Sequence, residues 1–167
     1  MKRILILNGA ARRNGKTDVL VHAFTEGADH AGNEIREIQL QDKVIHECLG
    51  CQACARMSEF CVQKDDMEKV YEGFLWADVI VFASPIYFGG ITGTLKTATD
   101  RLYSMWMKNG WRVEKECAML LTANSPIFDQ ALMWYSVFTK FSGWKSWGEV
   151  LGSGKTAQAA ALGASIH

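Results

Sequence analysis

Four of the five cysteines in this chain crowd into one short segment, from Cys48 to Cys61. Two residues separate Cys48 from Cys51 and Cys51 from Cys54, and six residues separate Cys54 from Cys61. Thiolates at this spacing can converge on one centre, and the compact Cys-x2-Cys-x2-Cys pattern favours a [4Fe–4S] cluster. Free or redox-active thiols are the next alternative. Zinc comes last, because structural zinc sites more often use two separated Cys-x2-Cys pairs.

A second chemical pattern is the segment GAARRNGKT, residues 9–17, which ends like the P-loop of a nucleoside-triphosphate enzyme. That P-loop reads G-x4-G-K-[ST] and requires a glycine at residue 10, where this chain has Ala10. The later segment GEVLGSGKT has the same mismatch, with Glu149 at the required position. No expected strand is followed by an aspartate that would hold the metal ion. We therefore do not expect an NTPase.

The segment 9–17 still has features that favour a phosphate. It joins an apolar run to a helical pattern, so unpaired amides and the positive end of a helix would face an anion. Asn14 and Thr17 carry hydrogen-bond donors, and the positive charge comes from Arg12, Arg13 and Lys16. These residues alone fit a single-phosphate site and an ordinary strand–helix turn with a solvated basic tip about equally.

Short apolar runs alternate with segments of helical periodicity along the chain. We expect strands at 3–8, 34–40, 78–83, 116–122 and 149–151, and helices at 17–31, 67–75, 95–107, 130–141 and 156–164. Alternation of strand and helix predicts a parallel sheet with helices on both faces. Ligands of such sheets bind beyond the carboxyl ends of the strands. Three loops are therefore candidates for function: 9–17, 85–93 and 123–128.

Several charged residues border the aperiodic cysteine segment, which runs from 44 to about 63. Asp65 and Asp66 precede a helical pattern and are predicted to cap it. Asp100 and Arg101 are assigned structural roles. The pattern after the two aspartates places these residues on the core face of the helix: Met67, Val70, Tyr71, Phe74 and Leu75.

Length and composition predict one globular domain spanning residues 1–167. Lys plus Arg and Asp plus Glu both total 18, so we expect no nucleic-acid surface. No apolar run reaches the roughly 18 residues of a membrane span. The apolar part of the first residues, Ile4–Leu7, is too short for a signal peptide, so we expect a cytoplasmic protein. An odd cysteine count then argues against a disulfide framework, and Cys117 in an apolar run indicates burial.

The chain resembles the NADPH-dependent FMN reductases of the flavodoxin-like superfamily, and within them the iron–sulfur flavoproteins. Their first loop typically reads G-S-P-R-x-x-G-N-T, and residues 9–17 match it in both glycines, the arginine, the threonine and the spacing. Ala10-Ala11 replaces the family's Ser-Pro, and Lys16 replaces its Asn. The cysteine segment followed by KDDM, and SPIYFG followed by LK and DR, match further family patterns. The likeness runs from residue 1 to about 125.

The resemblance implies an α/β fold: a flavodoxin-like three-layer sandwich whose five-stranded parallel sheet has the order 2-1-3-4-5. It also implies non-covalent FMN, with the phosphate on the first loop and the ring between the other two. The implied cofactor-binding residues are Ala10, Arg12, Asn14, Gly15, Lys16, Thr17, Pro85, Ile86, Tyr87, Phe88, Gly89, Gly90, Thr122, Ala123 and Asn124. The implied ligands of a [4Fe–4S] cluster are Cys48, Cys51, Cys54 and Cys61.

We therefore expect an FMN-dependent oxidoreductase that passes electrons from NAD(P)H to a quinone, a free flavin or an electron-transfer partner such as ferredoxin. No catalytic side chain is expected, because hydride passes directly from nicotinamide to flavin. The alternative is a non-catalytic flavodoxin-like or iron–sulfur electron carrier. Flavodoxins are usually strongly acidic, so the neutral composition favours the enzyme.

The resemblance further implies a homodimer or homotetramer with FMN near a subunit interface. Tryptophans gather late in the chain, and we expect them to divide between the core and an oligomer interface or substrate pocket. They are Trp106, Trp111, Trp134, Trp144 and Trp147.

Overall fold

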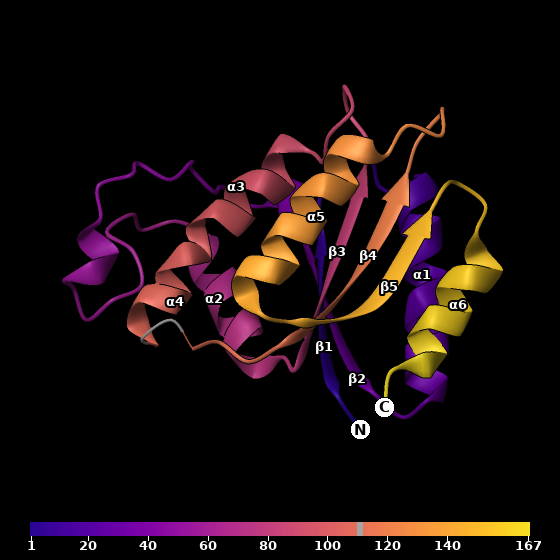
Figure 1. The fold of residues 1–167 in the computed structure, drawn as a ribbon, viewed down its shortest axis with the longest axis horizontal. Coiled ribbons are helices and arrows are strands. Elements are labelled where there is room, and N and C mark those ends of the chain that lie inside the picture. The colour runs from indigo at the N-terminus through magenta and orange to yellow at the C-terminus, as the bar shows by residue number, and fades with distance from the viewer. Residues whose placement is uncertain (110–111) are drawn as a thin grey trace.

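The computed structural model describes residues 1–109 and 112–167, and its centre is one parallel sheet (Figure 1). The strands are β1 (Arg3–Asn8), β2 (Glu34–Gln39), β3 (Val79–Pro85), β4 (Glu116–Thr122) and β5 (Lys145–Leu151). They are ordered β2-β1-β3-β4-β5, and each neighbouring pair is parallel. This order confirms the predicted flavodoxin-like fold. The order reverses between β1 and β3, which places the switch point at their carboxyl ends.

Helices cover both faces of the sheet, as the alternating pattern predicts. On one face lie α1 (Lys16–His30) and α6 (Thr156–Ser165); on the other lie α2 (Met67–Trp76), α3 (Gly93–Arg101), α4 (Tyr103–Lys108) and α5 (Asp129–Ser142) (Figure 1). Two 3-10 turns are present in this region: η1 (Leu40–Asp42) precedes the cysteine segment, and η2 (Ala53–Ala55) lies within it. Among the helices of the described chain, none has the length and apolarity that crossing a membrane requires.

Each face of the sheet has its own apolar core. In β1, Ile4 and Ile6 pack under α1 and α6, whereas Leu5 and Leu7 pack under the other helices. A strand buried on both faces needs apolar residues at every position, which explains the unbroken run at the amino end of the chain. The α5 face is rich in aromatic rings, with the centroids of Trp106 and Trp144 only 5.6 Å apart.

The predicted tryptophans mostly belong to this packing. Trp106 and Trp144 are buried, and Trp134 is partly buried beside Phe82. Trp147 packs on the opposite face of the sheet, and Trp111 lies outside the described residues.

The single helix predicted over 95–107 is wrong, because the chain forms α3 and α4 instead. The hydroxyls of Tyr71 and Ser104 donate to the carbonyl oxygen of Arg101 at 3.1 and 3.0 Å. The amide of Met105 bonds to the carbonyl three residues before it, at 2.8 Å, rather than to that of Arg101. The break therefore arises partly from a residue on another helix, which local periodicity does not report.

Two smaller predictions also need correction. The fifth strand, expected over 149–151, begins at Lys145. Its first half has no apolar alternation, and it follows β4 through a register shift between Cys117 and Met119. Leu75, expected to face the core, is 54% exposed because it lies on the outer side of α2.

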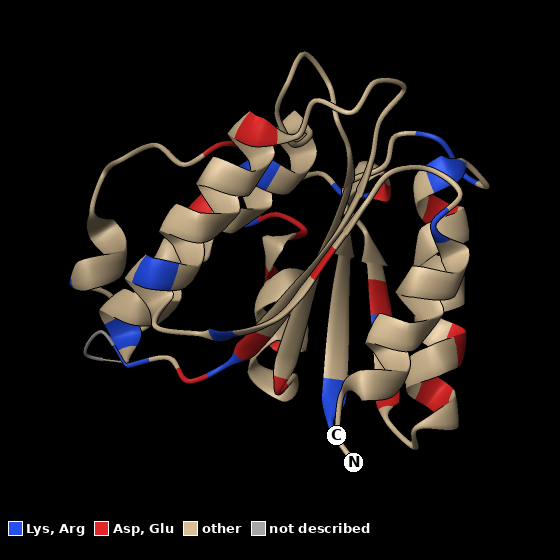
Figure 2. Cartoon of the chain, turned by 45° about the vertical axis from the view of Figure 1, so that its right-hand side comes forward, with Lys and Arg blue, Asp and Glu red and all other residues tan. Residues whose placement is uncertain are grey.

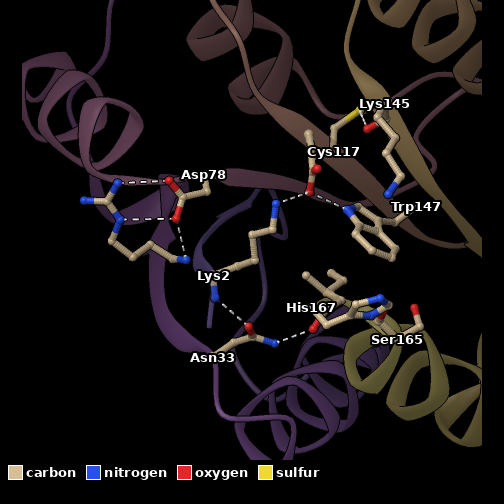
Figure 3. Close-up of polar contacts among 11 residues, drawn as sticks. Lys2, Asn33, Asp78, Cys117, Lys145, Trp147, Ser165 and His167 are labelled. Atoms are coloured by element: carbon tan, nitrogen blue, oxygen red, sulfur yellow. Dashed lines mark hydrogen bonds and ion pairs between the residues drawn. The ribbon is translucent and has the colours of Figure 1, made fainter.

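Polar contacts close the amino end of the sheet (Figure 3), where both ends of the described chain lie (Figure 1). The side chain of Asn33 accepts from the amide of Lys2 and donates to the carbonyl of Ile166, both at 2.8 Å. The carboxylate of Asp78 accepts from the amide and the guanidinium of Arg3 at 2.9 to 3.2 Å. These contacts leave the opposite edge, at the carboxyl ends of the strands, as the edge that presents the candidate loops.

Candidate functional site

A cleft opens at the carboxyl ends of β1, β3 and β4, next to the switch point. Three loops line it: the loop that enters α1, the loop after β3 and the loop after β4. The predicted cofactor-binding residues that line it are Ala10, Arg12, Gly15, Lys16, Thr17, Pro85, Ile86, Tyr87, Thr122, Ala123 and Asn124. Ala11, which the sequence prediction omitted, lines it as well.

The remaining predicted residues lie beside this cleft. Phe88 and Gly89 line an adjoining hollow that shares Ile86, Ala123 and Asn124 with the cleft. Asn14 and Gly90 line neither space. The structure thus brings most of the predicted residues together at one site. Asn14 and Gly90 instead contribute to the backbone conformation of their loops.

The first loop presents unpaired amides to the cleft. Gly15 precedes α1 without any side-chain cap, and the first amide of this turn with a helical partner is that of Val19, which donates to Gly15 O at 3.1 Å. In the described residues, the amides of Lys16 and Thr17 have no acceptor. An anion bound here would meet free donors and the positive end of α1.

Side chains of the first loop are also committed to neighbours. The hydroxyl of Thr17 is buried and bonds to the hydroxyl of Thr122 at 2.8 Å. The ammonium of Lys16 donates to Asn124 Oδ1 at 3.0 Å, across to the third loop. Figure 2 shows basic residues at the amino ends of α1 and α6, on the same edge as the cleft. Arg12 is exposed and forms no ion pair within the described chain, so its charge is available to an anion.

A buried polar network fixes the shape of the first loop. Asn8, fully buried, accepts from the amide of Ala10 at 2.9 Å and donates to Asp18 at 2.9 Å and Glu37 at 2.8 Å. Asp18 also accepts from the amide of Asn14, which has a φ of 56°. Gln39 donates to the carbonyl of Ala10 at 2.7 Å. Sequence reasoning missed this network, although a lone amide at the end of an apolar strand was its visible sign.

The second loop is a tight hairpin. The amide of Tyr87 donates to Gly90 O at 2.9 Å, and the amide of Gly90 donates to Tyr87 O at 3.2 Å. Phe88 and Gly89 both have positive φ, 49° and 89°, which is the pattern of a type I′ turn. Phe88 is fully exposed at the tip, and a left-handed conformation is costly for a bulky residue. A Cβ on Gly89 would lie 3.2 Å from the side-chain oxygen of Gln130 on α5, so little space is left for a side chain at this position.

The geometry of the cleft fits FMN. At one end, the free amides of the first loop and the charge of Arg12 match a phosphate monoester. At the other end, Pro85, Ile86 and Tyr87 and the backbone of the third loop form a mixed apolar and polar wall that suits a flat ring.

The cysteines occupy a separate region, beside α3 and α4. Cys48 and Cys51 are exposed, and Cys54 and Cys61 are partly buried. All four line one cavity. Over residues 1–109 and 112–167, however, no three His, Cys, Asp or Glu side chains are gathered closely enough to hold a metal ion. The donor set therefore fits an iron–sulfur cluster in its chemistry, and a bound cluster would require the thiols to draw together.

Two aspartates close the neck of this loop instead of simply capping α2. Asp65 accepts from the amides of Met67 at 3.1 Å and His46 at 3.0 Å, so it both caps the helix and fastens the loop. Asp66 forms no side-chain cap bond, which makes that prediction wrong; its carboxylate accepts from the amide of Val44 at 2.9 Å. Burial alone would raise the pKa of Asp65. The hydrogen bond from Arg101 and the two amide bonds together outweigh burial, so the pKa of Asp65 is lowered.

The fifth cysteine is buried, as predicted. The hydroxyl of Tyr135 donates to Cys117 Sγ at 3.2 Å and bonds to Ser146 Oγ at 2.8 Å. Burial raises the pKa of Cys117 to about 11, and this thiol is therefore protonated at neutral pH.

Comparison with known proteins agrees with these observations. An iron-sulfur flavoprotein of Methanocaldococcus jannaschii is 36% identical over 107 residues, which cover 64% of this chain and 54% of that protein. An iron-sulfur flavoprotein of Archaeoglobus fulgidus is 39% identical over 99 residues, 59% of this chain and 48% of that protein. The chain thus spans about half the length of these curated relatives.

Solved structures share the fold. A flavone reductase matches with a TM-score of 0.75 at 23% identity, over 97% of this chain and 60% of that one. An NAD(P)H:quinone oxidoreductase from Methanothermobacter marburgensis matches with a TM-score of 0.74 at 19% identity, over 99% and 97%. The model of the family described as NADPH-dependent FMN reductase matches residues 2–143, which include the three cleft loops and the cysteine segment. The chain therefore belongs to the NADPH-dependent FMN reductase family.

Proposed function

We propose that this protein is an FMN-dependent oxidoreductase that takes electrons from NAD(P)H and passes them to a quinone, a free flavin or an electron-transfer partner. The observation that supports it most is the single cleft formed by three loops at the switch point, with free amides at one end. One solved structure with this fold is an NAD(P)H:quinone oxidoreductase, and a quinone is therefore included among the proposed acceptors.

The first loop binds the FMN phosphate in this proposal. The amides of Lys16 and Thr17 donate to phosphate oxygens, and Arg12 adds a charge-assisted contact. Lys16 lies at the cleft wall, held by Asn124, so its charge reaches the anion without a change of loop shape. The hydroxyl of Thr17 has the neighbouring hydroxyl of Thr122 as a partner, and this pair forms the floor of the site.

The second and third loops orient the ring. The amide of Gly90 is bonded within the hairpin, so the amides that remain for the ring are those of Phe88 and Gly89. Donors at this position stabilise negative charge on a reduced flavin and tune its potential. When bound, FMN supplies the hydride-accepting chemistry; the chain supplies position and electrostatics, and no acid or base side chain is assigned.

Titration of the flavin-free protein tests this proposal. FMN is expected to bind more tightly than riboflavin, because only FMN carries the phosphate that the first loop accepts. Under anaerobic conditions, NADPH or NADH should then bleach the flavin band at about 450 nm, and the faster nucleotide identifies the donor. Protein that binds neither flavin at excess concentration would contradict the proposal.

We also propose that Cys48, Cys51, Cys54 and Cys61 hold a [4Fe–4S] cluster. The shared cavity and the four thiols support it, as do the relatives named iron-sulfur flavoprotein. Such a cluster transfers single electrons, which would suit a partner such as ferredoxin. Anaerobic reconstitution should give about four iron and four sulfide per chain, and a Cys51→Ala variant should give far less. Wild-type protein without iron under the same conditions would contradict this part alone.

A non-catalytic electron carrier is the second candidate, favoured by the cysteine cavity rather than by the cleft. The two candidates differ in one rate. A carrier binds FMN but is reduced by nicotinamide only very slowly, whereas the reductase is reduced within its turnover time. Stopped-flow mixing with NADPH and NADH separates them directly.

A homodimer or homotetramer is proposed from the outer side of α5. Ile127, Met133 and Val137 are each more than half exposed, at 58%, 66% and 58%; Met133 and Val137 lie one turn apart on α5, and Ile127 lines the hollow beside the cleft. Exposed apolar side chains gathered on one element favour self-association. Light scattering should show an oligomer, and a Met133→Glu, Val137→Glu double variant should be monomeric. A monomeric wild type would contradict the assembly without affecting the flavin proposal.

A further inference from the structure

Arg101, the last residue of α3, is buried in the wall of the cavity that all four loop cysteines line. We propose that Arg101 is the positioning residue of the cysteine site. Its guanidinium holds the neck of the loop closed, and its Nε–H is the hydrogen-bond donor for the sulfur anion that the loop carries. This inference rests on the proposed function of the cysteine loop.

The neck contacts of the guanidinium come from both ends of the loop. The Nη1 group donates to His46 O at 3.2 Å, where the chain enters the loop, and to Asp65 Oδ2, where the chain leaves it. The Nη2 group reaches Gln63 O at 3.5 Å. Asp65 in turn accepts from the amide of His46. One side chain therefore joins the two ends of the cysteine loop from a helix outside it.

The pair formed by Arg101 and Asp65 is almost entirely shielded from water, with side chains 1% and 3% exposed. A buried ion pair is stable only when its remaining donors and acceptors are satisfied. Asp65 meets this condition with two amide bonds. Arg101 does not, because its Nε–H is buried and has no acceptor within the described chain. An unpaired buried donor on a charged group is unfavourable, so the site is incomplete without an acceptor.

The surroundings of that donor point to sulfur. Apart from the four cysteines and Arg101, the cavity wall is formed by the apolar and aromatic residues Leu49, Phe60, Val62, Tyr71 and Tyr103 and by the polar residues Gln52, Gln63, Asp100 and Ser104. The side chain of Gln63 donates to the carbonyl of Glu47, and the hydroxyl of Ser104 donates to the carbonyl of Arg101. The carboxylate of Asp100 is paired with Lys96. The hydroxyl of Tyr71 is already bonded to the carbonyl of Arg101. A thiolate or a cluster sulfide is thus the acceptor that loading of the loop would supply.

Hydrogen bonds to the sulfur atoms are one of the factors that set the potential of an iron–sulfur cluster. A donor stabilises the more negative, reduced state, so its loss lowers the midpoint potential. Partners of this kind beyond the ligands also affect metal retention, with typical losses of about 10- to 100-fold on substitution. The proposal therefore separates two effects of Arg101, closure of the neck and donation to sulfur.

Two variants separate these effects. Arg101→Lys keeps a positive charge that can pair with Asp65, but it loses the Nε–H and the planar fork. Asp65→Asn removes the ion pair but leaves the Nε–H in place. After anaerobic reconstitution, we expect Arg101→Lys to retain several-fold less iron and sulfide than wild type, with a more negative midpoint potential in the clusters that form. We expect Asp65→Asn to loosen the neck with a much smaller change in potential.

Hydrogen exchange on the metal-free proteins tests the neck without any cluster. Amides of residues 44–47 and 64–67 should exchange faster in both variants, while FMN affinity, set at the other end of α3, stays unchanged and shows that each variant folds. Arg101→Lys with wild-type iron content, potential and neck exchange would overturn the proposal. If wild-type protein took up no iron, the sulfur-donor part would fall with the proposed cluster, and unchanged exchange in Arg101→Lys would overturn the neck part as well.

Discussion

The first loop (residues 9–17, the phosphate loop) and the cysteine segment (residues 44 to about 63, the cysteine loop) are both candidate cofactor sites, yet the fold holds them in different ways. The phosphate loop is anchored along its length, because Asn8, Asp18 and Gln39 bond its backbone from beneath. The cysteine loop is anchored at its neck, and two of its four thiols are exposed. A preorganised loop loses little conformational freedom on binding. A loop held at its neck must order when it is loaded, and its binding free energy is coupled to folding.

The largest difference should be in thiol reactivity. In metal-free, reduced protein, we expect the four loop cysteines to react with a thiol-specific disulfide reagent at least about 100-fold faster than Cys117, because the thiolate is the reactive form. Burial raises the pKa of Cys117 to about 11, so its thiolate fraction at pH 8 is small and grows as the pH rises towards that value. Stopped-flow absorbance should show four fast thiols and one slow thiol. Five equal rates would mean that the cysteine loop is as protected as the core.

The second prediction tests how closely the phosphate loop is packed. A Cβ on Gly9 would lie 2.4 Å from Thr92 Oγ1 and 2.8 Å from Leu95 Cβ, whereas a Cβ on Gly15 would meet only Arg12, at 3.2 Å. Overpacking of this kind costs about 1–3 kcal/mol. Gly9→Ala should therefore weaken FMN binding about 10- to 100-fold and lower the unfolding temperature.

Gly15→Ala is the matched control in the same loop. Its backbone has a φ of −82°, which any residue adopts, and its Cβ would meet only Arg12, with the carbonyl oxygen at 3.2 Å, so we expect a smaller loss of FMN affinity than in Gly9→Ala. Fluorescence titration of both variants measures this contrast. Equal losses of FMN affinity in the two variants would mean that the close packing around Gly9 does not determine the effect.

The third prediction concerns the buried network. Asn8→Ala leaves the buried amide of Ala10 without its acceptor, at a cost of about 1–3 kcal/mol. It also leaves the carboxylates of Asp18 and Glu37 without their shared donor, at a smaller cost because water reaches them. We expect about a 10-fold loss of FMN affinity, with little change for riboflavin, since the network supports only the phosphate end.

Asn33→Ala is the control for this variant. Asn33 is buried like Asn8, and its side-chain amide makes two hydrogen bonds to backbone atoms (Figure 3). It lies at the opposite end of the sheet from Asn8. Calorimetry should show comparable destabilisation in the two variants, while the FMN-specific loss appears in Asn8→Ala alone. A similar FMN loss in Asn33→Ala would mean that general stability, and not the network, sets the affinity.

The contrast between the two loops also explains what the sequence could reveal. The positions of the strands and of the three cleft loops follow from the apolar runs, and the strand order follows from the family resemblance, which rests on local motifs. The network around Asn8 joins residues of β1, β2 and α1, and nothing in the spacing of Asn8, Asp18 and Gln39 marks them as partners. The break at the end of α3 likewise depends on Tyr71. Asp66 has the residue type of a helix cap, and only tertiary contact shows that it bonds to Val44 instead.

The smallest effect should come from Lys16, the cation that replaces the family's Asn. Its ammonium is solvent-accessible and bonds to Asn124 at 3.0 Å, so its attraction for a phosphate is screened by water and salt. Lys16→Asn should weaken FMN binding by less than about 5-fold, and the loss should shrink as the salt concentration rises. Titrations at low and high salt measure both quantities. A loss as large as that of Asn8→Ala, and independent of salt, would mean that the phosphate loop depends on this side chain for its shape. The phosphate loop would then be less preorganised than its backbone contacts indicate, and its contrast with the cysteine loop would be much weaker.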